Sequence, residues 1–198
     1  MHPPAGNRVL PFRRHRGVEN VSGASFDDLD LFVNDRPEFA LWVDRIFDAL
    51  SRYPEGKLDI ILREKRFSRC VLVREELTLK LELINDVPSH IGLIRDHPSL
   101  GSVDSAENIL ANKITALMDR DEPKDIADIW AFYVKMGLSI HHALEGAGSE
   151  AVGIFPPDVA RALYQVNEDV FWRIKWIDPP SLTEFHQQGL CLRRILLY

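Results

Sequence analysis

The stretch Ser25–Val33, which reads SFDDLDLFV, constrains the fold of this chain more than any other feature. From Asp28 onward it alternates acidic and apolar residues, and a β-strand turns successive side chains to opposite faces. Asp28 and Asp30 would therefore lie together on one face, while the leucines that alternate with them point into a core. Neighbouring carboxylates repel each other, and a divalent metal, most often Mg2+ carrying a phosphate substrate, is the usual reason to pair them. The alternative interpretation is a polar turn or a solvated strand face.

Composition narrows the class of protein. The 198 residues, 45% hydrophobic and 27% charged, are typical of one soluble domain, or of a small domain with a helical appendage. A net charge of −6 argues against non-specific coating of nucleic acid, so any such contact should be local. Cys70 and Cys191 lie far apart without a CxxC motif, which predicts neither a zinc site nor a disulfide and favours a reducing cytoplasm. No apolar run is long enough to span a membrane, so we expect no membrane partner.

The first half of the chain predicts a sheet with a helix. The beginning holds three prolines and the basic run RRHR, and it reads as an irregular arm. A helix is predicted after Pro37, where apolar residues recur at helical spacing. Three strand-like runs follow, and we expect them to be adjacent antiparallel strands at about 57–63, 67–74 and 77–84.

The second half predicts helices. Ser105 is a good N-cap, and Pro123 suits a first helical turn. The stretch 86–104 reads as a loop or short connecting pieces, and the expected helices run over about 106–120, 123–136, 139–145 and 156–172. We therefore divide the chain into an irregular basic lead-in at 1–24, a sheet core at 25–104, and a helical part at 105–198 packed on it.

A third carboxylate is predicted beside the aspartate pair. Alternation in the run LTLKLELI sends Lys80 and Glu82 to the face opposite the leucines. If helices cover the leucine face, Asp28, Asp30 and Glu82 could lie together on the other face and complete a metal site. Asp59 competes for this role, and an ordinary charged pair on a wet sheet face is the alternative for Lys80 and Glu82.

Lys113 falls inside the apolar stripe of the helix predicted at 106–120, with Arg120 on the same side. A lysine there either reaches the surface along its own stem or places its ammonium in a cleft that holds an anion. In both cases Lys113→Met should preserve the fold, and in the second it should weaken phosphate binding. Asp125 and Asp128, three residues apart, share a face at the start of the next helix, where the helix dipole alone would favour an acid.

Four blocks of the sequence together resemble a known family. They are SFDDLDLF at 25–32, LKLEL at 79–83, ILANKITALMDR at 109–120 and KDIADIW at 124–130. In this order and spacing they resemble the nucleotidyltransferase toxins of the AbiEii abortive-infection family. The resemblance implies an α+β, polymerase-beta-like nucleotidyltransferase fold, with a small mixed sheet backed by helices and a helical C-terminal part.

The resemblance also implies roles for individual residues. Asp28 and Asp30 would bind Mg2+ or Mn2+ with a nucleoside triphosphate, Lys113 would hold a phosphate, and Asp125 would complete the catalytic site. Further implied positions are Glu82 as a metal ligand, and Ser25, Arg120 and Asp128 in substrate binding.

The activity that the resemblance implies is transfer of a nucleotide from a nucleoside triphosphate to a transfer RNA or protein acceptor. Family members are toxins of toxin–antitoxin pairs, so a cognate antitoxin is an expected partner. Two alternatives are a catalytically impaired binding module and an unrelated metal-dependent phosphohydrolase, although no His-Asp pair accompanies the carboxylates.

One difference from the family concerns a glycine turn. The family has a Gly-Gly or Gly-Ser turn before the aspartate strand, where backbone amides approach the triphosphate, and no such dipeptide precedes Asp28 here. We therefore expect an N-terminally truncated or degenerate member that is weakly active or inactive, unless Ser22–Ser25 forms the turn.

Overall fold

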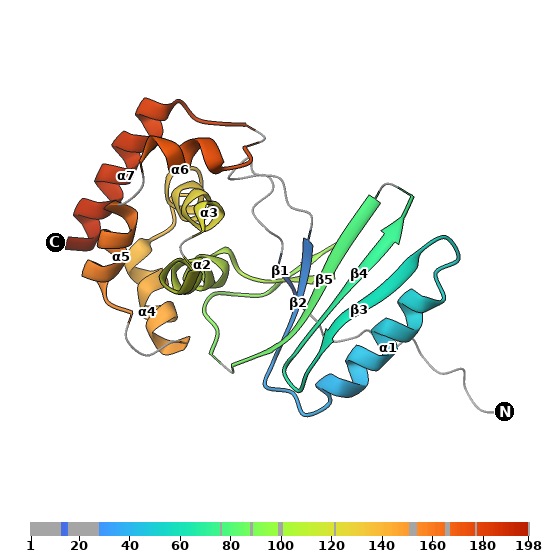
Figure 1. Cartoon of the computed structure of the whole chain (residues 1–198). Coiled ribbons are helices and arrows are strands. Elements are labelled where there is room, and N and C mark those ends of the chain that lie inside the picture. The colour runs from blue at the N-terminus through green and yellow to red at the C-terminus, as the bar shows by residue number, and fades with distance from the viewer. Residues whose placement is uncertain are drawn as a thin grey trace. The chain divides into compact units, whose positions relative to one another are not determined.

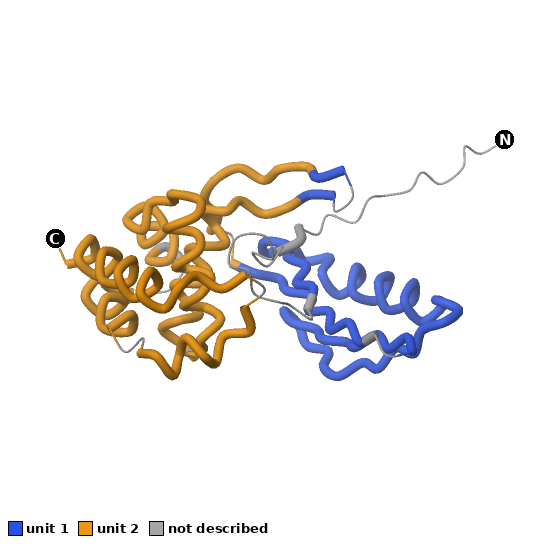
Figure 2. The backbone as a smooth tube through the Cα atoms, turned by 90° about the horizontal axis from the view of Figure 1, so that it is seen from above, with its two compact units in different colours: residues 1–15, 27–86, 97–102 blue, residues 16–26, 87–96, 103–198 orange. Residues whose placement is uncertain are grey.

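The computed structural model describes residues 13–15, 28–75, 77–87, 89–98, 101–120, 122–150, 154–164, 167–176 and 178–197. The chain divides into two compact units, coloured separately in Figure 2. Of the described residues, the first, the sheet unit, contains those within 13–15, 28–86 and 97–102, and the second, the helical unit, contains those within 87–96 and 103–197. Each unit is described by itself.

The sheet unit contains most of a mixed sheet (Figure 1). Within the described residues the strand order is β3-β4-β5-β2-β1-β7-β6. The strands are β1 (Arg13–His15), β2 (Asp28–Asn34), β3 (Lys57–Arg63), β4 (Phe67–Arg74), β5 (Leu77–Asp86), β6 (Arg95–His97) and β7 (Gly101–Val103). β3, β4 and β5 pair antiparallel, as their alternation predicts, whereas β2 pairs parallel to β5.

Alternation along the strands separates an apolar face from a polar face. The helix α1 (Phe39–Ser51) covers the apolar face, as Figure 1 shows. The buried residues of this core are Val33, Phe39, Val43, Phe47, Cys70, Leu81 and Leu83. Since Leu81 and Leu83 point into that core, Lys80 and Glu82 lie on the opposite face, as predicted.

The helical unit contains α2 (Ala106–Arg120), α3 (Pro123–Val134), α4 (Ile140–Glu150), α5 (Pro156–Tyr164), α6 (Glu168–Arg173) and α7 (Leu182–Leu197). The prediction of one helix over 156–172 is wrong. α6 is a separate helix because the side chain of Asn167 caps it, accepting a hydrogen bond from the Val170 amide at 3.0 Å. None of the described helices is both long and apolar enough to cross a membrane.

The start of α2 confirms Ser105 as a capping residue. Its hydroxyl oxygen accepts a hydrogen bond from the Asn108 amide at 3.0 Å and donates one to the Ile91 carbonyl at 2.6 Å. Asp104 accepts from the side chain of Asn108 at 2.9 Å, and its other oxygen lies 2.6 Å from Nε2 of His90. This buried polar network ties the segment before α2 to the helix, because every polar group in it needs its partner once removed from water.

Trp130, Phe171, Trp176 and Phe185 form one aromatic cluster in the C-terminal half. Trp130 on α3 lies 6.1 Å from Trp176 and 5.8 Å from Phe185, measured between ring centroids, and Phe171 lies 5.4 Å from Phe185. Tilted and edge-to-face contacts of this kind stabilise a core beyond the area they bury. These four rings therefore pack within the helical unit, whereas Trp172 on α6 is 67% exposed.

Both cysteines are free thiols. Cys191 on α7 is exposed, whereas Cys70 on β4 is buried. Burial raises the pKa of the Cys70 thiol to about 11, which leaves little reactive thiolate at neutral pH.

Two glycines in the middle of helices should respond in opposite ways to the same substitution. A Cβ on Gly146 in α4 would lie 2.5 Å from Cδ1 of Ile91 and 3.2 Å from Cβ of Ala111, whereas a Cβ on Gly189 in α7 would meet nothing within 4 Å. We expect Gly146→Ala to lower the free energy of unfolding by about 1–3 kcal/mol through overpacking. Gly189→Ala should raise it by about 0.5–1 kcal/mol, because alanine favours the helix.

Urea denaturation followed by circular dichroism measures both variants, and each serves as the control for the other. If both substitutions changed the free energy of unfolding equally and with the same sign, the close approach of α4 to its neighbours at Gly146 would be contradicted.

Candidate functional site

The polar face of the sheet carries a row of charged residues in register. Asp30 on β2 is the register partner of Glu82 on β5, which in turn is the partner of Arg69 on β4. The neighbouring row pairs Asp28 with Lys80. Register partners on adjacent strands point to the same face, so the fold gathers acids and bases from three strands. The Asp28 side chain and the whole of Ser25 lie outside the described residues.

Glu82 is the centre of this row. Its Oε1 accepts from Nε and Nη2 of Arg69, both at 2.8 Å, and lies 3.2 Å from Nζ of Lys80. The guanidinium of Arg69 also lies over the ring of Phe67, 5.2 Å from its centroid. One carboxylate oxygen therefore binds two basic side chains, one of which is further oriented by an aromatic ring.

Asp59, the predicted competitor of Glu82, lies in the same row as Lys80. It is the register partner of Val71 on β4, and Val71 is the partner of Lys80. Its carboxylate lies 3.2 Å from Nζ of Lys57 on its own edge strand, and both groups are well exposed. This is the geometry of a surface ion pair, which contributes little to stability.

The donors on the polar face suit a magnesium ion. Mg2+ is commonly held by one or two carboxylates, with water and substrate phosphates completing the octahedron. Asp30 and Glu82 supply two carboxylates on adjacent strands. Among the described side chains no group of three or more metal-binding residues occurs. Because the Asp28 side chain is not among them, the triad of Asp28, Asp30 and Glu82 stays a prediction.

The predicted residues of the helical unit form a buried ion cluster between α2 and α3. Nζ of Lys113 lies 2.7 Å from Oδ2 of Asp128 and 3.4 Å from Oδ1 of Asp125. Arg120 binds Asp125 with two hydrogen bonds, from Nε at 2.9 Å and from Nη2 at 3.0 Å. Both aspartate side chains are fully buried, while that of Lys113 is 14% exposed and that of Arg120 is 45% exposed.

The cluster changes the interpretation of Lys113. Burial alone would lower the pKa of its ammonium, but the charges and hydrogen bonds of Asp128 and Asp125 outweigh burial, so the pKa lies above its ordinary value. The ammonium of Lys113 is therefore paired with two carboxylates in this structure, and its role as a phosphate ligand stays a prediction. The ammonium neutralises two buried carboxylates that would otherwise be costly.

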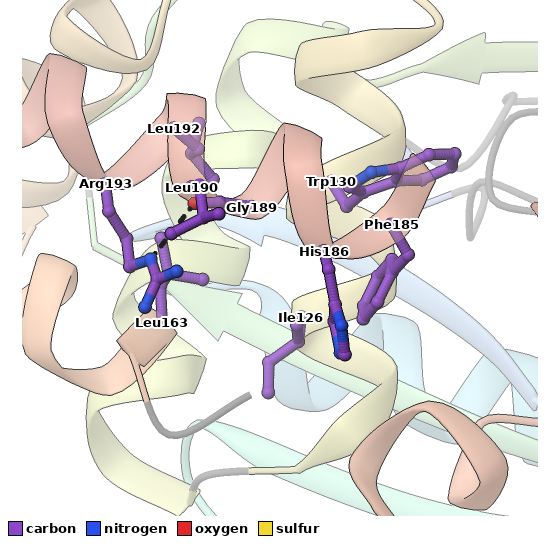
Figure 3. Close-up of a pocket in the computed structure, with 9 residues that line it drawn as sticks. All are labelled: Ile126, Trp130, Leu163, Phe185, His186, Gly189, Leu190, Leu192 and Arg193. Carbon is purple, nitrogen blue, oxygen red and sulfur yellow. Dashed lines mark hydrogen bonds between the residues drawn. The ribbon is translucent and has the colours of Figure 1, made fainter. Parts of the chain in front are cut away.

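A pocket of about 200 Å³ in the helical unit is distinct from this cluster. Figure 3 shows Trp130, Phe185 and His186 along one side, with Leu163 and Arg193 on the other. The lining is mainly apolar, and it includes none of the residues predicted for the site.

Arg69 is the functional candidate that sequence reasoning missed. The signal was present, because alternation in FSRCVLVR places Arg69 on the face opposite the buried Cys70. What was missing was the antiparallel register of β4 on β5, which sets Arg69 against Glu82. The structure thus brings together Asp30, Glu82, Lys80 and Arg69 in the sheet unit, and Lys113, Arg120, Asp125 and Asp128 in the helical unit.

Two solved structures are similar to this chain in fold. This fold is the polymerase-beta-like nucleotidyltransferase fold, and the predicted fold class is confirmed. JHP933 from Helicobacter pylori has a TM-score of 0.56 at 15% identity, with the likeness covering 94% of this chain and 83% of that one. A second H. pylori structure, described as a "putative nucleotidyltransferase", has a TM-score of 0.56 at 13% identity, covering 94% of this chain and 86% of that one.

A third structure is less similar. The nucleotidyltransferase toxin MenT4 from Mycobacterium tuberculosis has a TM-score of 0.42 at 15% identity, covering 92% of this chain and 85% of that one. The fold is established by the two H. pylori structures. No protein-family model and no curated protein sequence matches the chain.

Proposed function

We propose that the chain is an Mg2+-dependent nucleotidyltransferase of the AbiEii toxin type, which transfers a nucleotide from a nucleoside triphosphate to an RNA acceptor. The observation that carries this proposal is the pairing of Asp30 with Glu82 on adjacent strands, on the polar face of a nucleotidyltransferase fold. Paired carboxylates are the donors that a metal-bound triphosphate requires. The four sequence blocks described above support the same activity independently.

In this proposal Asp28 and Asp30 hold the metal, with Glu82 as the third acidic residue. The bound Mg2+ would neutralise the phosphates as charge develops on the leaving pyrophosphate. Transfer joins the acceptor hydroxyl to the α-phosphate and breaks the bond between the α- and β-phosphates. The chain's own residues therefore mainly position the reacting groups and neutralise the charge of the phosphates.

The helical unit carries basic residues that also have a role in this proposal. Lys113 and the half-exposed Arg120 are the proposed phosphate ligands, and Asp125 and Asp128 hold their charged groups in fixed positions. A rigid arrangement matters because a misplacement of about 1 Å can cost on the order of a hundredfold in rate.

The biological role proposed here is that of a toxin restrained by a cognate antitoxin. The proposed acceptor is transfer RNA, with a protein acceptor as the second possibility. Since the net charge is −6, the acceptor would be gripped locally by basic side chains and not by a general positive field.

The test is a transfer assay with the purified chain, Mg2+, each of the four α-labelled nucleoside triphosphates in turn, and total transfer RNA or total protein as acceptor. We expect label in the RNA fraction with at least one nucleotide, and loss of transfer in EDTA. Labelled nucleoside monophosphate or diphosphate without labelled acceptor would favour the phosphohydrolase. Saturable nucleotide binding without any product would favour the binding module, and either result would overturn the proposal.

A further inference from the structure

The cation arrangement at Glu82 has a feature that a simple surface salt bridge lacks. Both nitrogens that Arg69 uses, and Nζ of Lys80, converge on the single oxygen Oε1. The remaining nitrogen of the guanidinium, Nη1, donates no hydrogen bond within the described residues. A guanidinium has five N–H donors, so Arg69 has donors available for a second anion.

The guanidinium is also held in place before any ligand arrives. The ring of Phe67 lies 5.2 Å from the guanidinium carbon, and the Glu82 side chain that anchors it is only 15% exposed. Packing against an aromatic ring and a charge-assisted hydrogen bond both reduce the entropy that a ligand must remove. Arg69 is thus a preorganised cation on the same face as the paired carboxylates.

The two cations at Oε1 compete with a metal for Glu82. A dication that took this oxygen as a ligand would meet Arg69 and Lys80 at close range, and like charges at such distances repel. An anion that accompanied the metal would remove the conflict, since phosphate oxygens are the best partners for a guanidinium. Metal and phosphate should therefore bind this face together.

We propose that Arg69 is a phosphate-binding residue of the nucleotide site, and that Glu82 holds its guanidinium until Mg2+ and the triphosphate bind. Oε1 of Glu82 would then be a ligand of the metal, and the donors of Arg69 would bind the phosphates. This inference rests on the proposed function and adds to it a residue and an exchange of partners. When no metal is bound, Glu82 is a positioning residue for Arg69.

The test compares Arg69→Met with Arg74→Met in the full chain. Arg74 lies on the same strand and its side chain is 43% exposed, against 40% for Arg69, but it binds Glu55 and the Tyr53 hydroxyl instead. Calorimetry with inorganic tripolyphosphate in the presence of Mg2+ measures the affinity for phosphate. Titration of Mn2+ alone, followed by its electron paramagnetic resonance signal, measures the affinity for the metal without phosphate.

The affinity for tripolyphosphate and the affinity for Mn2+ alone should change in opposite directions. Arg69→Met should weaken tripolyphosphate binding by about tenfold or more, because a charge-assisted hydrogen bond is lost. The same variant should bind Mn2+ alone about tenfold more tightly at low ionic strength, since a repelling cation has gone. Arg69→Lys should recover part of the phosphate affinity, and Arg74→Met should match the wild type in both affinities.

Unchanged tripolyphosphate affinity in Arg69→Met would overturn the inference, and so would weaker binding of Mn2+ alone. Both readouts are independent of nucleotide transfer. If the wild type transfers nucleotide and Arg69→Met binds both ligands normally, the inference fails while the proposed function stands. If the wild type binds tripolyphosphate through Arg69 but transfers nothing, the proposed function fails instead.

Discussion

Asp30→Asn should reduce metal-dependent nucleotide transfer by about a hundredfold to a thousandfold. Asparagine keeps the size of the side chain and one oxygen, but it removes the negative charge that the metal requires. The position is the register partner of Glu82 on the polar face, so the change leaves the apolar core under α1 intact. Circular dichroism and thermal unfolding of the variant should resemble those of the wild type, which separates a lost charge from a lost fold.

Asp59→Asn is the matched control. It removes a carboxylate from the same sheet, at an exposed position on the edge strand where Lys57 is the partner. We expect transfer within about twofold of the wild type, because surface ion pairs of this kind contribute about 0–1 kcal/mol. If Asp59→Asn abolishes transfer and Asp30→Asn does not, the acidic pair of the site has been misassigned.

Lys113→Met should destabilise the helical unit by about 3–5 kcal/mol. Methionine fills the space of the lysine stem, but it leaves Asp128 and Asp125 fully buried without the ammonium that lies 2.7 Å and 3.4 Å from them. Arg120 still binds Asp125, so the larger part of the loss falls on Asp128. The buried ion cluster thus replaces the expectation, drawn from sequence, that this substitution preserves the fold.

Two comparisons sharpen this prediction. Lys124→Met removes an exposed lysine from α3 whose partner is Glu122, and it should change the free energy of unfolding by less than about 1 kcal/mol. Combining Lys113→Met with Asp128→Asn should recover part of the loss, because the unpaired charge is gone. Urea denaturation measures all of them, and a Lys113→Met protein as stable as Lys124→Met would show that the cluster contributes nothing.

The pH dependence of Lys113 follows from the direction of its shift. A raised pKa in the folded state means that its stabilisation is fully present below the unfolded-state value of about 10.4 and is lost as the pH rises through the folded-state value. The Lys113 ammonium contributes part of the difference in the free energy of unfolding between the wild type and Lys113→Met. This part should therefore not change between about pH 6 and about pH 9.

Sequence patterns were informative where one physical rule decides the outcome. Alternation in β2 and β5 depends on the period of a strand, and it correctly placed Lys80 and Glu82 opposite the buried leucines. The cap of α2 at Ser105 depends on a local hydrogen bond, and it was also predicted correctly. The break between α5 and α6 was missed because apolar residues continue at helical spacing across it, while the Asn167 cap competes locally with helix continuation.

The sequence by itself determined which residues carry charge, and on which face of a strand or helix each one lies, because the periods of 2 and 3.6 residues are properties of the backbone. It thereby placed Asp30 and Glu82 on polar strand faces, and Lys113 on the buried side of α2. Only the tertiary structure decided their partners. The register of β4 on β5 sets Arg69 against Glu82, and the packing of α2 on α3 sets Lys113 between two aspartates. Such pairings join residues distant in the chain, so they depend on strand register and helix packing, which no local pattern specifies.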